Sequence, residues 1–186
     1  MRVISGASRG TKLFSLEGEN TRPTLDRVKE ALFNIIQMEL NDAIVLDLFA
    51  GSGALGIEAL SRGAKKVYFC DSSIEATNII NKNLEKTKLK EKSKVYKLKF
   101  EEALKIIKNE NIKFDIIFLD PPYKTNYISK AIEKILEYNL IKDNTLLVLE
   151  TDEENRVLEE IKNTVLDIYD VRKYGRVSLL FSKRKG

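Results

Sequence analysis

The chain has 186 residues, of which 43% are hydrophobic, and a formal net charge of +4 at pH 7. It is long and apolar enough to bury a core of its own, which excludes disorder and a disulfide scaffold, and no stretch approaches the roughly 20 apolar residues of a membrane span. Because it contains no histidine and a single cysteine, Ser-His-Asp and Cys-His catalysis, an internal disulfide and a histidine-ligated metal are excluded as well.

Residues 1–23 differ in character from the rest of the chain. They are basic and contain only short apolar pieces between glycines. Because the first fifteen residues carry Arg2, Arg9 and Lys12 and no long apolar run, they are not expected to be a secretory signal. With one cysteine and no histidine, the chain is expected to be a cytoplasmic protein that binds no metal. We predict a single domain over residues 1–186, in which residues 1–23 are a basic extension and residues 24–186 form the core.

Beyond this extension, apolar runs alternate with amphipathic segments. A first helix is predicted from residue 24, with Thr24 as its N-cap after Pro23. Strands are predicted at 44–49, 66–70, 94–98, 115–119 and 145–149, and further helices near 54–62, 73–86, 101–109, 126–138 and 153–163. This alternation predicts a parallel sheet with helices on both faces.

Two further strand-like stretches follow the last predicted helix. Residues 165–174 and 176–183 meet at Gly175 with no helix between them, which predicts an antiparallel hairpin at the edge of the sheet. The predicted class is α/β, with a mostly parallel seven-stranded sheet and an antiparallel C-terminal hairpin. This is the plan of the Rossmann-like fold of S-adenosylmethionine-dependent methyltransferases.

A glycine-rich loop follows the first predicted strand. Gly51, Gly53 and Gly56 satisfy the spacing G-x-G-x-x-G, and Asp71 ends the second strand, where its carboxylate could accept hydrogen bonds from ribose hydroxyls. Asp47 precedes the loop and favours S-adenosylmethionine over a dinucleotide, because a carboxylate attracts a cationic amino group and repels a pyrophosphate. The cofactor residues expected here are Asp47, Phe49, Ala50, Gly51, Ser52, Gly53, Gly56 and Asp71.

The glycine loop also has simpler interpretations. It could be a strand-to-helix turn that binds nothing, and Asp71 could be the N-cap of the next helix, since Ser72 and Ser73 follow it. The presence of Asp47 and Asp71 at the places where a donor would need them favours cofactor binding.

The tetrapeptide Asp120-Pro121-Pro122-Tyr123 follows the fourth predicted strand, at the edge of the sheet where ligands bind. Alone it could merely end a strand, because proline cannot continue the ladder. Beside a glycine loop it favours methyl transfer to an exocyclic amino nitrogen of a base. The Asp120 carboxylate and the Pro121 carbonyl would each accept one N–H of that amino group, and Tyr123 would stack on the base. All four residues are expected to be catalytic.

Several blocks of the sequence resemble one known family over nearly the whole length. They are Arg-Val-Ile-Ser-Gly at 2–6, Thr-Arg-Pro-Thr at 21–24, Asp-Arg-Val-Lys-Glu-Ala-Leu-Phe-Asn at 26–34, Leu-Asp-Leu-Phe-Ala-Gly-Ser-Gly at 46–53, Asp-Pro-Pro-Tyr at 120–123 and Tyr-Gly at 174–175. In these blocks the chain resembles the RsmD family of bacterial 16S ribosomal RNA guanine-N2 methyltransferases. The Arg-Pro-Thr block is the most family-specific, because methyltransferases in general share the glycine loop.

The resemblance implies that 16S rRNA, within an assembling small ribosomal subunit, receives one methyl group from S-adenosylmethionine. The amino-terminal block is compatible with this, since its arginines could contact phosphates and Thr24 could bind the donor's carboxylate from a helix N-terminus. For Arg27, a solvated helix face is an equal alternative. Residues 6–20 are expected to be mobile until RNA binds, and the protein to be a monomer. The expected nucleic-acid contacts are Arg2, Arg9, Arg22 and Arg27.

The stretch after the third strand departs from the family pattern. Many members have an aspartate there that reads the adenine amino group, whereas this chain has Lys99 near that position. We therefore expect adenine to be held through Phe100 and its backbone, with Glu101 as a substitute acceptor.

Three other functions remain open from the residues. Asp-Pro-Pro-Tyr also occurs in adenine-N6 methyltransferases that act on RNA or DNA. The G-x-G-x-x-G spacing alone would suit an NAD-dependent dehydrogenase, which leaves Asp47 and residues 120–123 without a role. A non-catalytic RNA-binding module with a relic cofactor pocket is the third, against which the intact Asp120 argues.

Overall fold

The computed structural model describes residues 1–16 and 23–186, with side chains described from residue 26 onward in the second range. The helices are α1 (Pro23–Ile35), α2 (Ala54–Ser61), α3 (Ile74–Thr87), α4 (Phe100–Lys108), α5 (Tyr127–Glu137) and α6 (Glu154–Lys162), with 3-10 turns η1 (Gln37–Glu39) and η2 (Lys90–Lys92). The strands are β1 (Ile44–Asp47), β2 (Lys66–Asp71), β3 (Ser93–Lys97), β4 (Phe114–Leu119), β5 (Ile141–Thr151), β6 (Leu166–Tyr174) and β7 (Val177–Arg184).

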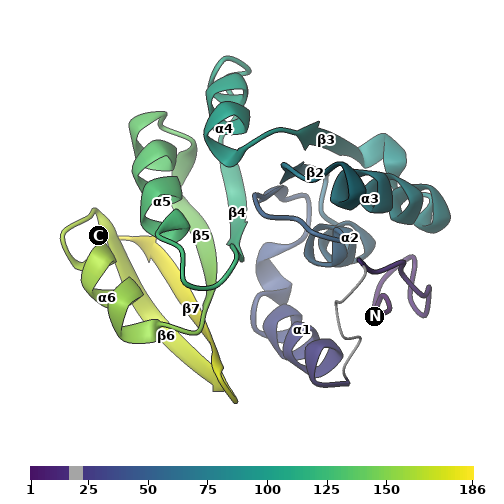
Figure 1. Ribbon diagram of the computed structural model, residues 1–186, viewed down its shortest axis with the longest axis horizontal. Helices are drawn as coiled ribbons and strands as arrows, with labels where there is room; N and C mark the ends of the chain where they lie inside the picture. The colour runs from purple at the N-terminus through teal and green to yellow at the C-terminus, as the bar shows by residue number, and fades with distance from the viewer. Residues whose placement is uncertain (17–22) are drawn as a thin grey trace.

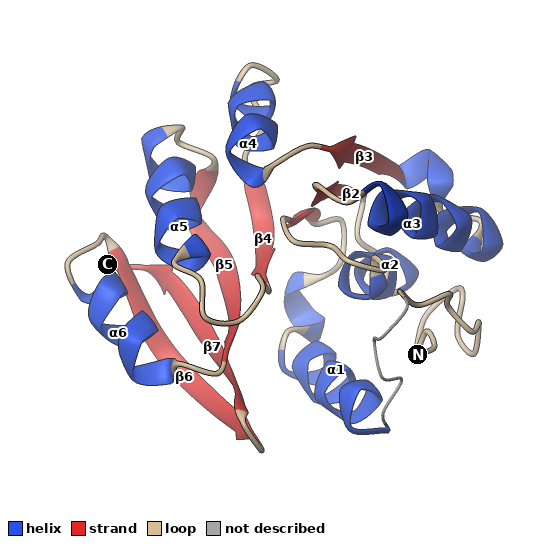
Figure 2. Ribbon diagram, viewed as in Figure 1, coloured by secondary structure: helices blue, strands red, loops and turns tan. Residues whose placement is uncertain are grey.

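The seven strands form one sheet in the order β3-β2-β1-β4-β5-β7-β6 (Figure 2). Strands β1 to β5 are parallel, and β7 runs antiparallel between β5 and β6. This confirms the predicted α/β class and the C-terminal hairpin. The chain builds the sheet outward from β1 to β3 and then resumes at β4 on the other side of β1. The order therefore reverses between β1 and β4, and in such sheets ligands bind outside the carboxyl ends of the strands at this point.

Helices cover both faces of the sheet, with α1, α2 and α3 on one side and α4, α5 and α6 on the other (Figure 1). Alternation along β4 shows how one strand serves both layers. Ile116 and Phe118 pack under the first group of helices, and Ile117 and Leu119 under the second. Side chains of the same parity therefore share a face, which determines where the polar residues at the strand ends point.

Residues 1–16 are docked on the domain. Val3 and Leu13 are buried in the core layer of α1, α2 and α3. At Gly6, which has φ +84°, a Cβ atom would lie 1.8 Å from the Ser61 carbonyl oxygen, so only glycine permits this approach. The expectation of a mobile segment is therefore wrong for residues 6–16, because burial of apolar side chains holds them; residues 17–20 lie outside the described residues.

Most predicted boundaries are shifted by one residue, and three of the differences affect the interpretation. Helix α1 begins at Pro23, so Thr24 is not its N-cap; proline suits a first helical position because that N–H needs no partner. Strand β1 ends at Asp47, two residues early, because the chain turns into the glycine loop there. Strand β5 extends at both ends, from Ile141 to Thr151. Over the described ranges, no helix is long and apolar enough to cross a membrane.

Candidate functional site

A cavity of about 730 Å³ opens at the carboxyl ends of the parallel strands. Besides Glu101 of α4, four carboxylates line it, one at the carboxyl end of each of four adjacent strands: Asp71 on β2, Asp47 on β1, Asp120 directly after β4 and Glu150 on β5. The sheet order thus sets them in a row across the cavity. Within the part of the chain that the structure describes, no group of three or more His, Cys, Asp or Glu side chains could hold a metal ion.

Most of the site residues expected from the sequence line this cavity. They are Asp47, Phe49, Ala50, Gly51, Ser52, Asp71, Phe100, Glu101, Asp120, Pro121, Pro122 and Tyr123. Gly53 and Gly56 do not line it. Arg22 and the side chain of Thr24 lie outside what the structure describes.

The glycines of the loop have different tasks. Gly51 faces the cavity and donates its N–H to Asp71 Oδ2 at 2.9 Å. Gly53 has φ +81°, precedes the first residue of α2 and donates its N–H to the Ala50 carbonyl at 2.7 Å. At Gly56 a Cβ atom would lie 2.3 Å from Phe69 Cε1, so glycine is needed for α2 to pack on β2. Both glycines shape the turn behind the cavity lining, and their contact with a cofactor stays a prediction.

Asp47 is buried beneath the loop. Its Oδ2 accepts a hydrogen bond from the Gly56 N–H at 3.0 Å, and only 1% of the residue is exposed. Burial raises the pKa of Asp47 to about 7; the Gly56 hydrogen bond opposes this rise and the charge of Asp71 adds to it. A buried carboxylate with no described cationic partner would gain a favourable neighbour if a ligand brought an ammonium group into the cavity.

Replacing Asp47 with asparagine is expected to stabilise the ligand-free protein at pH 8. The folded pKa of about 7 lies above the ordinary 3.8, so between these values the folded state binds a proton that the unfolded state has released, and the free energy of unfolding falls as pH rises. Asparagine stays neutral and can still accept from Gly56. We expect Asp47→Asn to gain about 2–4 kcal/mol at pH 8 and distinctly less at pH 5. Urea unfolding at both pH values measures this, and an equal difference at both would contradict it.

Asp71 holds the loop with both carboxylate oxygens. Oδ2 accepts from Gly51 N–H, and Oδ1 accepts from Ser73 N–H at 2.9 Å. The N-cap of α3 is Ser73, whose hydroxyl accepts from the Ala76 N–H at 3.2 Å, so Asp71 is not a helix cap. Each carboxylate oxygen has a second lone pair. Asp71 can therefore orient the loop and still accept hydrogen bonds from a ligand.

An aromatic cluster borders the cavity on the face of the sheet that α4 and α5 cover. The rings of Phe49 and Phe100 lie 5.3 Å apart, centroid to centroid, and Tyr127 lies 5.3 Å from Phe100 and 6.0 Å from Phe49. Phe100 is the first residue of α4, and Lys99 and Glu101 beside it also line the cavity. This arrangement offers apolar surface for a planar ring, with a carboxylate in the first turn of α4. The sequence did not indicate Tyr127.

Residues 120–123 form the opposite wall with Glu150. Tyr123 is 50% exposed, so its ring presents a face to the cavity. Partial burial and the nearby charges of Glu150, Asp120 and Asp152 raise the pKa of the Tyr123 hydroxyl, and a side-chain hydrogen bond joins it to Glu150. The hydroxyl therefore stays protonated at neutral pH and acts as a donor.

Arg2, Arg9 and Arg27 do not line the main cavity. They meet instead around a second hollow of about 590 Å³, which Asp26 and Glu30 also border. The structure therefore groups the three described arginines that the sequence analysis assigned to nucleic acid. The two acidic residues lower the net charge of this hollow.

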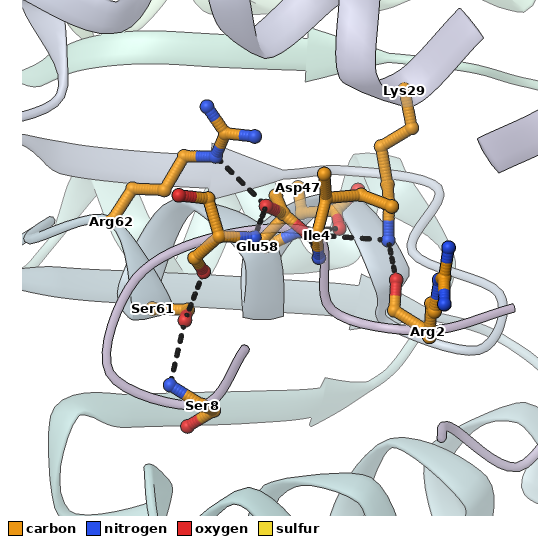
Figure 3. Close-up of polar contacts among 10 residues, drawn as sticks. Arg2, Ile4, Ser8, Lys29, Asp47, Glu58, Ser61 and Arg62 are labelled. Atoms are coloured by element: carbon orange, nitrogen blue, oxygen red, sulfur yellow. Dashed lines mark hydrogen bonds and ion pairs between the residues drawn. The ribbon is translucent and has the colours of Figure 1, made fainter. Parts of the chain in front are cut away.

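Lys29 lines the main cavity and was not expected from the sequence. Its ammonium group donates to the Arg2 carbonyl at 2.6 Å and lies 3.3 Å from Glu58 Oε2 (Figure 3). The buried Glu58 carboxylate also accepts from the N–H groups of Ile4 and Ser5 and from Arg62 Nε, at 2.8, 3.0 and 2.8 Å. Burial lowers the pKa of Lys29, and Glu58 opposes that shift. The amino-terminal segment is thus fastened directly behind the cavity.

Glu150 is a third residue that the sequence analysis missed, although a signal was present. Parallel strands deliver their carboxyl ends to one edge, and that rule selected Asp47, Asp71 and Asp120. The fifth predicted strand ended at residue 149, so Glu150 fell just beyond it. In the structure β5 runs on to Thr151, and Glu150 lines the cavity.

A family model, similar sequences and solved structures match this chain. A family model described as "Conserved hypothetical protein 95" matches residues 1–183. "Ribosomal RNA small subunit methyltransferase D" of Haemophilus influenzae is 41% identical over 89% of this chain and 86% of that protein. "Putative rRNA methyltransferase YlbH" of Bacillus subtilis is 39% identical over the full length of both. The solved structure of "Putative methyltransferase yhhF" from Escherichia coli superposes with a TM-score of 0.83 at 29% identity, covering 100% of this chain and 98% of that one.

Proposed function

Because this chain belongs to the family described as conserved hypothetical protein 95, the RsmD family, we propose that it transfers a methyl group from S-adenosylmethionine to the exocyclic N2 of a guanine in small-subunit ribosomal RNA. One observation carries the proposal. The glycine loop, Asp47, Asp71 and residues 120–123 border a single cavity at the reversal point of the sheet. A dehydrogenase would leave Asp120 and its neighbours without a role.

The cavity suits S-adenosylmethionine in size and chemistry. Its volume of about 730 Å³ lies within the range of cofactor sites. We assign Asp71 to the ribose hydroxyls, Asp47 to the cationic amino end and the aromatic cluster of Phe49, Phe100 and Tyr127 to the adenine ring. Glu101 can accept from the adenine amino group, at the place where Lys99 departs from the family's aspartate. When bound, the cofactor supplies a methyl group on a positively charged sulfur.

The tetrapeptide would prepare the amino group for transfer. The nitrogen is a poor nucleophile because its lone pair is delocalised into the base. The Asp120 carboxylate and the Pro121 carbonyl would each accept one N–H, which orients the nitrogen and stabilises the positive charge that develops on it. Pro122 makes the turn rigid, and the half-exposed ring of Tyr123 would stack on the base. No histidine is needed, because the proton can leave after transfer.

The RNA would approach from the side of the amino-terminal segment. Arg2, Arg9 and Arg27 supply cations for backbone phosphates next to the cavity, whereas Asp26 and Glu30 would keep that contact weak at high salt. The proposal includes Arg22 and Thr24 as further contacts. It also includes a monomer of one domain, acting in the cytoplasm on a small subunit that is still being assembled.

The product decides between this proposal and its alternatives. Small ribosomal subunits that lack the modification would be incubated with the protein and labelled S-adenosylmethionine, then digested to nucleosides and separated. N2-methylguanosine supports the proposal, and mapping the label identifies the nucleotide. N6-methyladenosine would instead establish an adenine-N6 enzyme. Absence of label on subunits, naked rRNA and DNA, together with absence of cofactor binding, would reject the methyltransferase.

Asp71→Ala is expected to weaken binding of S-adenosylmethionine by about 10- to 100-fold, because it removes both the ribose acceptor and the partner of the Gly51 N–H. The fold should persist, since Asp71 lies at the edge of the cavity and Ser73 still caps α3. Isothermal titration calorimetry measures the affinity, and circular dichroism checks the fold. Asp167→Ala, on the exposed part of β6, is the control. An affinity within about twofold of the wild type would remove Asp71 from the cofactor site.

A further inference from the structure

We propose that Glu150 selects guanine, because its carboxylate accepts a hydrogen bond from the ring N1–H of the target base while Asp120 and Pro121 hold the adjacent amino group. The inference rests on the proposed function and adds the residue that determines which base is accepted. It would make Glu150 a specificity-determining residue in direct contact with the substrate.

The register of the sheet sets Glu150 beside Asp120. Leu119 of β4 pairs with Leu149 of β5, and Asp120 and Glu150 are the next residues of the two parallel strands. Neighbouring parallel strands lie ~4.8 Å apart. The two carboxylates are therefore adjacent at the edge of the sheet, and both line the cavity.

The side chain of Glu150 lies on the same face of the sheet as Asp47, the face that α1, α2 and α3 cover. Val148, two residues earlier on β5, packs in the layer of α1, α2 and α3, and so does Leu179, the register partner of Glu150 on β7. Phe118 of β4 and Val45 of β1 belong to the same layer. By alternation, Glu150 and Asp47 then share one face. A base held by Asp120 would meet Glu150 on the side away from Asp47 and the cofactor loop, because β5 lies beyond β4 in the sheet.

Aromatic and apolar groups close this end of the cavity. Tyr123 contributes its ring, and Tyr174 and Val177 reach in from the β6–β7 hairpin. Together they form a slot for a flat base, with the polar edge of the base directed at Asp120 and Glu150. Asp71, which we assign to the cofactor, lies on β2, on the other side of β1 from β4 and β5.

Glu150 has acceptor capacity to spare. Its side chain forms a hydrogen bond with Tyr123. Among the residues that the structure describes, no lysine or arginine forms an ion pair with it. A carboxylate accepts about four hydrogen bonds, so one hydroxyl leaves room for a substrate donor. Burial raises the pKa of Glu150, and the Tyr123 contact opposes that rise. A second donor from the substrate would favour the ionised form in the same way.

Guanine alone among the common bases has a ring N–H next to an amino group. It can therefore donate to Glu150 from the ring while Asp120 and Pro121 accept from the amino group. Its Watson–Crick edge carries N1–H beside the two N–H groups of N2. Adenine and cytosine have an unprotonated ring nitrogen beside their amino group, and a carboxylate would repel that lone pair. A buried site built to accept a hydrogen bond rejects an analogue without the donor strongly, since its own polar group is left unpaired.

The test uses 2-aminopurine, which keeps an amino group at C2 but has an unprotonated N1. RNA with guanosine or 2-aminopurine at the mapped nucleotide would be assembled into subunits and compared in single-turnover methyl transfer. Wild-type protein is expected to methylate the guanosine substrate at least about 100-fold faster. Glu150→Gln, whose amide can donate to an unprotonated N1, should lower the guanosine rate and reduce that ratio at least tenfold. Glu159→Gln, an exposed carboxylate of α6, should leave both rates unchanged.

The outcomes distinguish the role of Glu150 from the proposed methylation of guanine. A wild-type ratio near one, or a ratio unchanged in Glu150→Gln, would overturn the role of Glu150 while guanine methylation stands. The wild-type ratio needs no variant, and cofactor binding by Glu150→Gln checks that the variant folds. Failure of the wild-type protein to methylate guanosine in any substrate would overturn the proposed function and this inference with it.

Discussion

Asp120→Ala is expected to lower the rate of methyl transfer by about 10²–10³-fold while changing the affinity for S-adenosylmethionine by less than about threefold. The carboxylate would act only on the amino group of the base, where positive charge develops during transfer, so its loss affects the transition state more than the bound cofactor. Asp120 directly follows β4, whereas the cavity residues assigned to the cofactor lie at β1, at β2, in the glycine loop and at the starts of α4 and α5.

Asp152→Asn is the matched control for this prediction. It removes an acidic charge that acts on Tyr123 from beyond the end of β5, and Asp152 does not line the cavity. Single-turnover rates with saturating cofactor and subunits, and calorimetric affinities for the cofactor, would be measured for both variants. If Asp120→Ala lost cofactor affinity as strongly as Asp71→Ala, the division of roles between the two aspartates would be wrong.

Glu58→Ala is expected to lower the free energy of unfolding by about 3–5 kcal/mol. This is the largest effect on stability that we expect from a single substitution in this protein. The fully buried carboxylate pairs with Lys29 and Arg62 and accepts from the N–H groups of Ile4 and Ser5. Alanine would leave a buried ammonium without its counter-charge and two backbone donors without an acceptor. The Lys29 pKa, already lowered by burial, would fall further.

Guanidinium unfolding measures the destabilisation, and hydrogen exchange locates it. The amides of Ile4 and Ser5 should lose protection before those of β4. Glu137→Ala is the control, because it removes a half-exposed carboxylate whose partner, Lys134, lies on the surface of α5; it should change stability by less than about 0.5 kcal/mol. A loss below about 1 kcal/mol for Glu58→Ala would show that the buried carboxylate contributes little and that the apolar residues and the hydrogen bonds to Ser61 and Asn83 hold the amino-terminal segment.

The parts of the candidate site could be predicted from the sequence to different degrees. Asp47, Asp71 and Asp120 could be located because each ends an apolar strand run, and parallel strands bring such ends to one edge. Gly51 could be located from the G-x-G-x-x-G spacing of the loop that follows the first of these strands. Glu150 was missed because β5 continues past its apolar centre, and strand length depends on pairing with β4 and β7, which local composition does not report.

The amino-terminal third of the chain shows more clearly what could not be predicted from the sequence. In the sequence, residues 1–23 look like a polar, glycine-rich arm. In the structure, Val3 and Leu13 are core residues, Gly6 lies against the Ser61 carbonyl, and Ile4 and Ser5 are bound by a carboxylate far along the chain. Lys29 and Glu58 resemble ordinary surface charges of helices, and only their mutual burial reveals a structural pair.

The sequence by itself determined the class of the fold, the place of the glycine loop and the tetrapeptide, and the chemistry that these residues favour. Such features are local: apolar periodicity follows from strand and helix geometry, and turn residues act on their immediate neighbours. The tertiary structure alone decided that four carboxylates stand in a row, that Gly56 serves helix packing, and that Arg2, Arg9 and Arg27 gather around one hollow. These depend on the order of the strands and on contacts between distant residues, because burial and charge pairing arise only when the chain has closed on itself.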